Sequence, residues 1–328
     1  MESGLAEVAA ISQHPTAMLP GAKCPRRAHS VVEMGAMFDQ LFASAGSVQE
    51  SIATWRPRAT DVVISPFSKC GTTWLQQIFH TLRTRGDTEF DDISRVVPWI
   101  ETALLLGLDL EAPQKAEPRG FKSHLPFHML PTGAKAIVAL RDPKDALVSI
   151  FRFMEGWFLE PGSLTLDEFA PSRLDVPPDT GYFGHLLSWW EQRHDKGVLL
   201  LTYEQMSTDP QGTIRRVAAF CDIALDDELL ALTLERSSLG WMRQHKSKFD
   251  DPMMHAAAVR LCGLPDEIGT GKVRRGQVGG HADEMSPELS ARVDQCWREI
   301  VTPALGFHSY ADLDAALHAE ARLGGWAR

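Results

Sequence analysis

Residues Asp61-Val-Val-Ile-Ser65 run directly into Pro66-Phe-Ser-Lys-Cys-Gly-Thr-Thr-Trp74, and this stretch decides the fold class. The short β-branched run, bounded by Pro66, predicts a buried strand. After it, one helical face collects the apolar side chains Trp74, Leu75, Ile78, Phe79 and Leu82, and Gly86 stands where that helix should end. The order is therefore strand, tight loop and helix.

The same order recurs along the chain. Residues 135–140 predict a second strand, after which Asp142 can cap a helix that has Pro143 in its first turn. Residues 198–202 predict another strand, followed by a helix over about 211–221. Strands that alternate with helices predict an α/β fold with a central parallel sheet flanked by helices and joined by right-handed crossovers.

We expect a single domain over residues 31–328, preceded by a partly ordered arm over residues 1–30. Two segments rich in proline or glycine predict loops, residues 171–181 and residues 249–283. The second is too long for an idle connection, so it is interpreted as a functional or lid loop. A final helix is expected to start at Ser286-Pro287.

The composition excludes several classes of protein. With 44% hydrophobic residues among 328, the chain has ample material for a core, which excludes a disordered or fibrous protein. The net charge of −10 argues against a nucleic-acid partner, and no apolar run has the length of a membrane span. Five scattered cysteines fit neither a disulfide framework nor a zinc site, so a cytoplasmic location is expected. The oligomeric state stays open.

The loop after the first strand has the features of an anion cradle. A glycine turn at a helix N-terminus offers backbone N–H groups, Lys69 adds a cation, and Thr72 and Thr73 add hydroxyl donors. The lysine precedes a single glycine, which departs from the Walker pattern for ATP or GTP. A plain strand-to-helix turn with a solvated lysine is the alternative. Further basic residues, Lys122, Arg141, Arg274 and Arg275, follow strands or lie in loops, where an open α/β sheet binds its ligand.

Five segments in order resemble the cytosolic-type sulfotransferase family over about residues 60–300. They are Ser68-Lys-Cys-Gly-Thr-Thr-Trp74, Lys122-Ser-His-Leu-Pro126, Arg141-Asp-Pro-Lys-Asp145 with Ser149, Tyr203-Glu-Gln-Met206 and Arg274-Arg-Gly276. Each segment alone is a weak match, and the five together, with family-like spacing, are a strong one. The resemblance implies transfer of a sulfuryl group from 3′-phosphoadenosine 5′-phosphosulfate (PAPS) to a hydroxyl or amine of a small-molecule acceptor, which leaves 3′-phosphoadenosine 5′-phosphate (PAP).

The resemblance also implies roles for individual residues. His124 would be the catalytic base, with Lys69, Lys122 and Ser149 in the catalytic group, and no metal is expected. The co-substrate would be bound by Lys69, Cys70, Gly71, Thr72, Thr73, Trp74, Arg141, Ser149, Tyr203, Ser237, Leu239, Arg274, Arg275 and Gly276.

The acceptor site is less legible in the sequence. Phe127, Phe153, Trp157 and Phe158 follow catalytic segments and are interpreted as the wall of an apolar cleft, which favours a hydrophobic alcohol or phenol. Only Phe153 matches an acceptor-pocket position of the family. A P-loop-like nucleotide kinase and a non-catalytic nucleotide-binding module are the alternative functions.

The chain departs from the family pattern at several positions. Ser68 replaces a proline, and Cys70 replaces a serine. Cys70 is interpreted either as a small residue tolerated in the loop or as a thiol whose pKa is lowered by the helix N-terminus and Lys69. Lys272 stands where the family often has an aromatic residue over the adenine.

Overall fold

A computed structural model describes residues 25–43, 48–269 and 271–323, so most of the expected N-terminal arm lies outside the described residues. The centre is a parallel sheet of β1 (Val62–Ile64), β2 (Gly120–Lys122), β3 (Lys135–Leu140) and β4 (Val198–Thr202), in the order β2-β1-β3-β4. The expected α/β fold with a central parallel sheet is confirmed. Because the chain leaves β1 for one side of the sheet and returns to place β3 on the other, the carboxyl ends of β1 and β3 form a topological switch point.

Alternation along β3 directs its side chains to two opposite faces of the sheet. Ile137 and Ala139 belong to a core with α3 (Thr72–Thr84), α10 (Pro210–Phe220) and α11 (Asp227–Arg236). Ala136, Val138 and Leu140 belong to a second core with α8 (Gly181–Trp190) and α16 (Tyr310–Leu323). The sheet is therefore buried on both faces, as the β-branched and apolar composition of its strands predicts.

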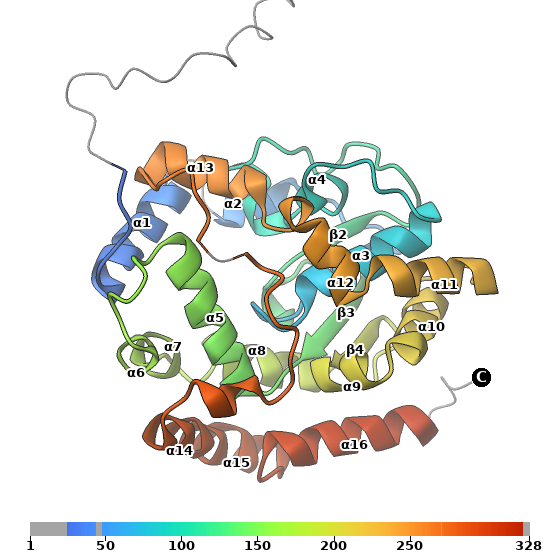
Figure 1. The fold of residues 1–328 in the computed structure, drawn as a ribbon. Coiled ribbons are helices and arrows are strands. Elements are labelled where there is room, and N and C mark those ends of the chain that lie inside the picture. Colours follow the sequence, from blue (N-terminus) through green and yellow to red (C-terminus); the bar gives the residue numbers. More distant parts are fainter. Residues whose placement is uncertain (1–24, 44–47, 270, 324–328) are drawn as a thin grey trace, which may run out of the picture.

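A third core lies beside the sheet rather than on it. It joins α1 (Val31–Ala43), α5 (Pro143–Trp157), α13 (Pro252–Cys262) and α14 (Pro287–Cys296). Figure 1 shows α1 and α13 next to each other, α5 to one side of the sheet, and α14 to α16 along one edge of the molecule. This helical layer covers the carboxyl end of the sheet and supplies one wall of the site described below.

Helix ends follow their capping residues. The side chain of Asp142 accepts a hydrogen bond from Lys144 N at 2.8 Å, which caps α5 as expected. The side chain of Ser286 caps α14 in the same way. Remaining helices are α2 (Val48–Thr54), α4 (Ile93–Val96), α6 (Leu166–Phe169), α7 (Pro171–Leu174), α9 (Tyr203–Thr208), α12 (Leu239–Gln244) and α15 (Thr302–Leu305). Short 3₁₀ turns lie at Ile100–Thr102, Phe127–Met129, Lys246–Lys248 and Gly280–Asp283, and a π-helical turn, Trp297–Val301, joins α14 to α15.

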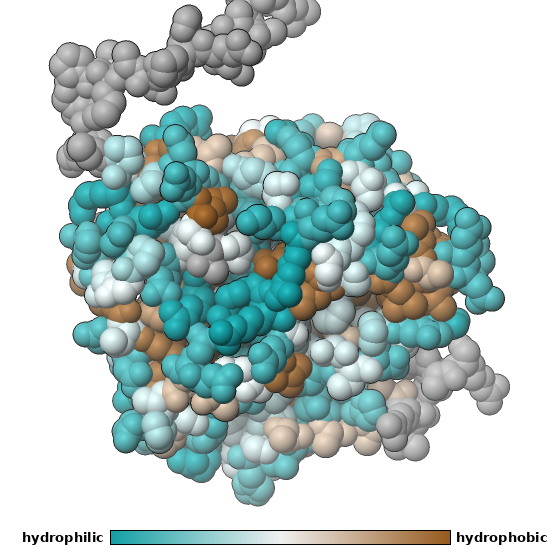
Figure 2. Space-filling model, in the orientation of Figure 1, coloured by the Kyte–Doolittle hydropathy of each residue, from teal (hydrophilic) through white to brown (hydrophobic). Residues whose placement is uncertain are grey.

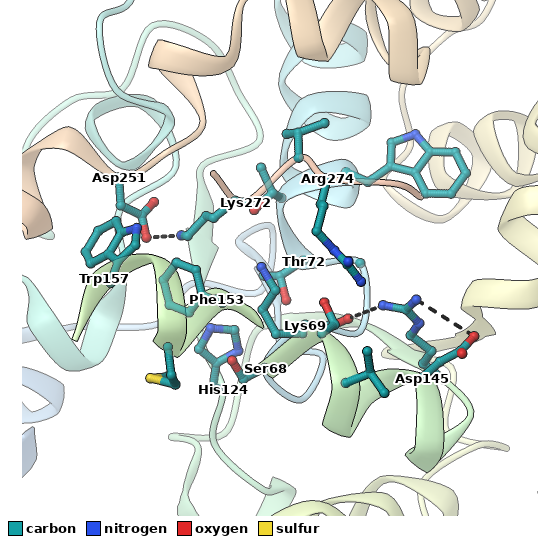
Figure 3. Close-up of a pocket in the computed structure, with 18 of the residues that line it drawn as sticks. Ser68, Lys69, Thr72, His124, Asp145, Phe153, Trp157, Asp251, Lys272 and Arg274 are labelled. Carbon is teal, nitrogen blue, oxygen red and sulfur yellow. Dashed lines mark hydrogen bonds and ion pairs between the residues drawn. The ribbon is translucent and has the colours of Figure 1, made fainter. Parts of the chain in front are cut away.

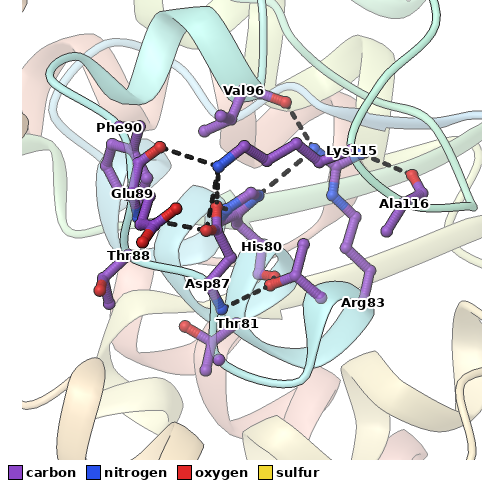
Figure 4. A network of polar contacts seen from close by, with 12 residues as sticks. His80, Thr81, Arg83, Asp87, Thr88, Glu89, Phe90, Val96, Lys115 and Ala116 are labelled. Carbon is purple, nitrogen blue, oxygen red and sulfur yellow. Dashed lines mark hydrogen bonds and ion pairs between the residues drawn. The ribbon is translucent and has the colours of Figure 1, made fainter.

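A polar network ties the long connection before β2 to α3 (Figure 4). The buried Arg83 donates to the carbonyl oxygens of Pro118 at 3.0 Å and of Val96. His80 pairs with Asp87 at 3.0 Å, and Lys115 reaches the same carboxylate at 2.9 Å. These contacts provide hydrogen-bond donors for carbonyl groups in an irregular segment that forms no regular helix or sheet over much of its length.

Three expectations about secondary structure need correction. The segment expected as a loop over 171–181 begins with helix α7, and the segment over 249–283 contains the helix α13. Pro171 and Pro252 stand at the first positions of these helices, where proline is tolerated, so their presence was misread as a loop signal. The helix that starts after Ser286 is also not final, because α16 follows it.

Two further findings concern the described part of the chain. Its four cysteines, Cys70, Cys221, Cys262 and Cys296, are free of disulfide bonds. Within the same ranges, no helix combines the length and the apolar character needed to cross a membrane.

Candidate active site

The carboxyl ends of all four strands meet around one cavity of about 930 Å³. Ile64 at the end of β1 pairs in register with Lys122 at the end of β2, so the loop after β1 lies beside Lys122. Arg141 follows β3, and Tyr203 follows β4. Residues that follow different strands, far apart in the sequence, therefore line one hollow, because parallel strands share a carboxyl edge.

The loop between β1 and α3 is bent by two left-handed residues, Lys69 with φ 67° and Gly71 with φ 94°. A Cβ atom on Gly71 would lie 3.1 Å from the ring of Tyr203, so both the dihedral angle and the close approach favour glycine. No side chain caps the N-terminus of α3, and the buried hydroxyl of Thr72 has no hydrogen-bond partner among the described residues. The loop thus leaves donors available for an anion.

Three lysines and one aspartate form a buried charged cluster on this cavity (Figure 3). Lys272 pairs with the carboxylate of Asp251, and the Nζ atom of Lys122 lies 3.7 Å from the same carboxylate. Burial lowers the pKa of Lys69 to about 7, with Arg141 and Lys122 adding to the shift, and burial lowers the pKa of Lys122 to about 8. The carboxylates of Asp92, Asp250 and Glu101 also act on these lysines, so the cluster is mixed in charge. An anion bound next to Lys69 and Lys122 would raise their lowered pKa values and favour their charged forms.

A second group of cations lies on the other side of the loop. Arg141 donates to the carbonyl oxygen of Lys69 at 2.9 Å and lies 4.3 Å above the ring of Tyr203, while its buried Nε has no partner among the described residues. Arg274 and Arg275 pair with one carboxylate of Glu284 at 3.0 and 3.3 Å. Figure 2 shows a strongly hydrophilic surface over α5 and the segment that precedes α14.

His124 lines the cavity, and its hydrogen bonding fixes which ring nitrogen carries the proton. Its Nδ1 lies 2.8 Å from the carbonyl oxygen of Pro66, so Nδ1 carries the proton and Nε2 is left with its lone pair. Burial, followed by the nearby Lys122, holds the pKa of the imidazole well below its usual range. The edge of the Trp99 ring, 5.1 Å away between centroids, packs against the imidazole. His124 is therefore a neutral, oriented proton acceptor.

Aromatic and small residues line the part of the cavity beside α12. The rings of Trp74 and Tyr203 meet edge to face, with centroids 5.7 Å apart. The hydroxyl of Ser237 donates to the carbonyl oxygen of Thr233 at 2.6 Å, and Leu239 is partly exposed next to Gly276. Flat rings beside small side chains are suited to a planar base.

The opposite part of the cavity is apolar. Its side chains come from α1, α5 and the start of α13 and are Met34, Phe38, Leu41, Phe42, Val148, Phe153, Met154, Trp157 and Met254. The Nζ atom of Lys69 lies 4.6 Å from the centroid of Phe153, so the apolar part begins next to the cationic loop. A ligand can therefore place a polar end at Lys69 and an apolar body among these side chains.

The structure brings together almost every site residue that the sequence singled out. Cys70 and Phe127 do not line the cavity. Phe127 packs against Trp189, 5.4 Å away between centroids, in the core under α8. Residues that do line it are Lys69, Gly71, Thr72, Thr73, Trp74, Lys122, His124, Arg141, Ser149, Phe153, Trp157, Phe158, Tyr203, Ser237, Leu239, Arg274, Arg275 and Gly276.

Cys70 does not have the properties of a reactive thiol. It is 1% exposed, and burial raises the pKa of its thiol to about 12, so the expectation of a lowered pKa is wrong. Its backbone N–H donates to the carbonyl oxygen of Phe67 at 3.1 Å, which uses this donor inside the loop. Its tight burial fits a small residue tolerated in the turn.

Several residues of the site were missed by the sequence analysis. Trp99 lies 3.8 Å from the Nζ atom of Lys122, measured to the ring centroid, and a carboxylate oxygen of Glu101 accepts from His124 N at 2.7 Å. Asp251 and the apolar face of α1 were missed as well. The apolar spacing in α1 is typical of any packed helix, so no sequence signal separates a cavity wall from core.

Comparison with known proteins agrees with this geometry. The family model described as "Sulfotransferase domain" matches residues 59–303. Mouse "Sulfotransferase 1 family member D1" is 29% identical over 226 residues, which cover 65% of this chain and 76% of that protein. Rabbit "Amine sulfotransferase" is 28% identical over 266 residues, which cover 77% and 84% of the two chains.

Solved structures support the fold. A retinol dehydratase in complex with androsterone and the inactive cofactor PAP aligns with a TM-score of 0.64 at 20% identity, over 82% of this chain and 94% of that chain. Mouse sulfotransferase SULT7A1 complexed with PAP aligns with a TM-score of 0.62 at 23% identity, over 84% and 94%. Since the sulfotransferase family model covers most of the chain, including the loop after β1, His124 and Arg274, this protein belongs to the sulfotransferase family.

Proposed function

We propose that this sulfotransferase takes the sulfuryl group from PAPS and transfers it to a hydroxyl of a hydrophobic small molecule, with His124 as the base. The observation that carries the proposal is one cavity in which a buried lysine cluster and an arginine group flank a neutral, oriented imidazole. The names of the related structures, which contain PAP, support the same co-substrate class.

The residues present fit a ligand with two separate anionic ends. The Thr72 hydroxyl and the Arg141 Nε are buried polar atoms that lack partners in the described chain, and both residues line the cavity. Lys69, Gly71, Thr72 and Thr73 would hold the 5′-phosphosulfate at the N-terminus of α3. The 3′-phosphate would bind the other cationic group, which comprises Arg141, Ser149, Arg274, Arg275 and Gly276.

The adenine would lie between these two groups, against Trp74, Tyr203, Ser237 and Leu239. Lys272 is turned to Asp251 by an ion pair, so it does not act as a stacking partner for the base. Aromatic contact is instead supplied by the Trp74 and Tyr203 pair.

In the proposed step, the acceptor oxygen attacks sulfur in line with the bond to the bridging oxygen of the phosphosulfate. His124 Nε2 takes the acceptor proton, and PAP leaves with the electron pair of the broken bond. Lys69 and Lys122 stabilise the negative charge that builds on the bridging oxygen. The negative donor also raises the pKa of the imidazole in the complex, which strengthens it as a base.

A kinase acting on a nucleoside triphosphate is the alternative enzyme, and it would need a divalent metal. A chelator separates the two reactions, because it should stop a kinase and leave sulfuryl transfer unchanged.

The test incubates the protein with sulfur-labelled PAPS and a panel of phenols, aliphatic alcohols, amines and sugars, with products identified by mass spectrometry. We expect sulfated phenols or alcohols, and a His124→Ala variant that loses about a hundredfold or more in turnover while it still binds PAP. His128→Ala is the matched control, since His128 is exposed on the neighbouring turn outside the cavity. Unchanged turnover in His124→Ala would show that His124 is not the base. A parent protein that binds PAP but sulfates no acceptor would be a nucleotide-binding module.

A further inference from the structure

Arg173 places a positive charge on the wall of the same cavity that α1 and α5 make apolar. It lies in the short helix α7, next to α6 and α5 (Figure 1), and it lines the cavity together with Ser172. Its guanidinium carbon lies 5.3 Å from the centroid of Phe169, so the group rests on the apolar core. A charged group at this position needs a partner or solvent.

Within residues 25–43, 48–269 and 271–323, the Arg173 guanidinium makes no hydrogen bond or ion pair, and its Nε atom is buried without a partner. Arg216 is half-buried like Arg173 and also has a buried Nε without a partner, but its terminal nitrogen donates to the carbonyl oxygen of Leu200 at 3.3 Å. Burial alone lowers the pKa of Arg173. The side chain therefore differs from the structural arginines of this fold.

Nearby acids do not neutralise Arg173. Asp175, two residues along the chain, pairs with Arg292. Asp39 also lines the cavity, but it is exposed on α1 and forms no ion pair with Arg173 in the described structure. Glu155 and Glu284 pair with Arg152 at 2.6 and 2.7 Å. Among the residues that the structure describes, the Arg173 guanidinium on this cavity therefore has no acidic partner.

We infer that the acceptor is a hydroxylated carboxylic acid with an apolar body, whose carboxylate pairs with Arg173 while its hydroxyl faces His124. This inference rests on the proposed function and narrows its acceptor class. A guanidinium presents a planar fork of N–H groups that matches a carboxylate, and an apolar surrounding strengthens the pair. The apolar side chains between the two ends would hold the body of the acceptor.

The test compares 4-(hydroxyphenyl)alkanoic acids of increasing chain length with their methyl esters, which keep shape and lose charge. For one chain length, the kcat/KM of the acid should exceed that of its methyl ester about tenfold or more. In Arg173→Met this ratio should fall to about one, because methionine keeps the apolar stem and removes the charge. Arg173→Lys should keep part of the preference. Ser172→Ala, on the same wall, is the matched control and should keep all of it.

A second measurement is independent of turnover. The 4-methoxy analogue of the preferred acid has no transferable hydrogen, and its binding to the PAP complex is followed by calorimetry. Binding that is lost in Arg173→Met but kept in Ser172→Ala supports the anion site even if no acceptor is sulfated, in which case only the proposed function fails. Equal kcat/KM for acid and ester, or equal binding of the analogue to the parent protein and Arg173→Met, overturns the inference. Unchanged affinity for PAP in each variant shows that the fold is intact.

Discussion

Raising the pH from about 7 to about 8.5 is expected to weaken the binding of PAP, because Lys69 loses its proton in this range. Burial and the nearby Arg141 and Lys122 lower the pKa of Lys69 to about 7 in the free protein. The 5′-phosphate would restore the charged form in the complex. Lys69 is thus half charged at about pH 7 and only about 3% charged at about pH 8.5, so the dissociation constant should rise roughly 15-fold, or about 1.6 kcal/mol.

Two other titrations act on the same measurement. The phosphate groups of PAP have a second pKa of about 6, so their charge is nearly constant above pH 7. Lys122, with a pKa of about 8, changes the affinity in the same direction as Lys69. The roughly 15-fold rise in the dissociation constant, which counts Lys69 alone, is therefore a lower limit.

The assay is isothermal titration calorimetry with PAP, in buffers that differ in ionisation enthalpy. At about pH 8.5 Lys69 should contribute nearly one proton of uptake per PAP and Lys122 a further fraction, since both lysines are charged in the complex and mostly neutral in the free protein. Lys69→Arg is the control, because arginine stays charged over this range and should leave only the weaker contribution of Lys122. Equal dissociation constants at both ends of the pH range, with no proton uptake, would refute the reasoning.

Three further predictions concern binding and stability. Glu284→Gln should bind PAP about threefold more tightly in low salt, because Arg274 loses a partly exposed competing carboxylate at 3.0 Å; weaker binding in calorimetry would mean that Glu284 positions the arginine instead. Asp61→Ala should lower the free energy of unfolding by about 3 kcal/mol in urea titrations, because it removes the two contacts of the buried Arg119 at 2.6 and 2.9 Å and leaves Glu111, at 3.2 Å, as its acidic partner; a loss below about 1 kcal/mol would contradict this. Burial lowers the pKa of His80 to about 4 in the folded protein, so protonation below about pH 6.5 favours the unfolded chain. The free energy of unfolding should therefore fall by up to about 3 kcal/mol as the pH drops from about 6.5 to 4. If His80→Gln shows the same loss of thermal stability in acid as the parent protein, this prediction is wrong.

Much of the fold was predictable because its signals are local. The β-branched run at 62–64 and the apolar strand at 135–140 lie where the sequence predicts them, and the helix after Asp142 begins at its cap. Such elements depend on side-chain spacing, capping and turn residues within a few positions. The helices α7 and α13 were missed because proline at a helix start resembles proline in a loop.

Many of the residues that line the cavity were predictable for a similar reason. In a parallel sheet, residues that follow different strands meet at one edge, so Lys69, Lys122 and Arg141 could be grouped before their distances were known. Phe127 was misassigned because it follows a catalytic segment in the sequence, whereas in the structure it packs under α8 against Trp189. Proximity along the chain is a poor guide to a cavity wall.

By itself, the sequence determined the alternation of strands and helices, the glycine turn at a helix N-terminus and the chemistry available in its motifs. Only the tertiary structure decided which side chains share the cavity and in what state. It places Asp251 between Lys122 and Lys272, buries Cys70 so that its thiol stays protonated, and leaves Arg173 without an acidic partner in the described chain. The physical reason is that backbone preferences act over a few residues, while burial and charge pairing depend on contacts between segments far apart in the chain.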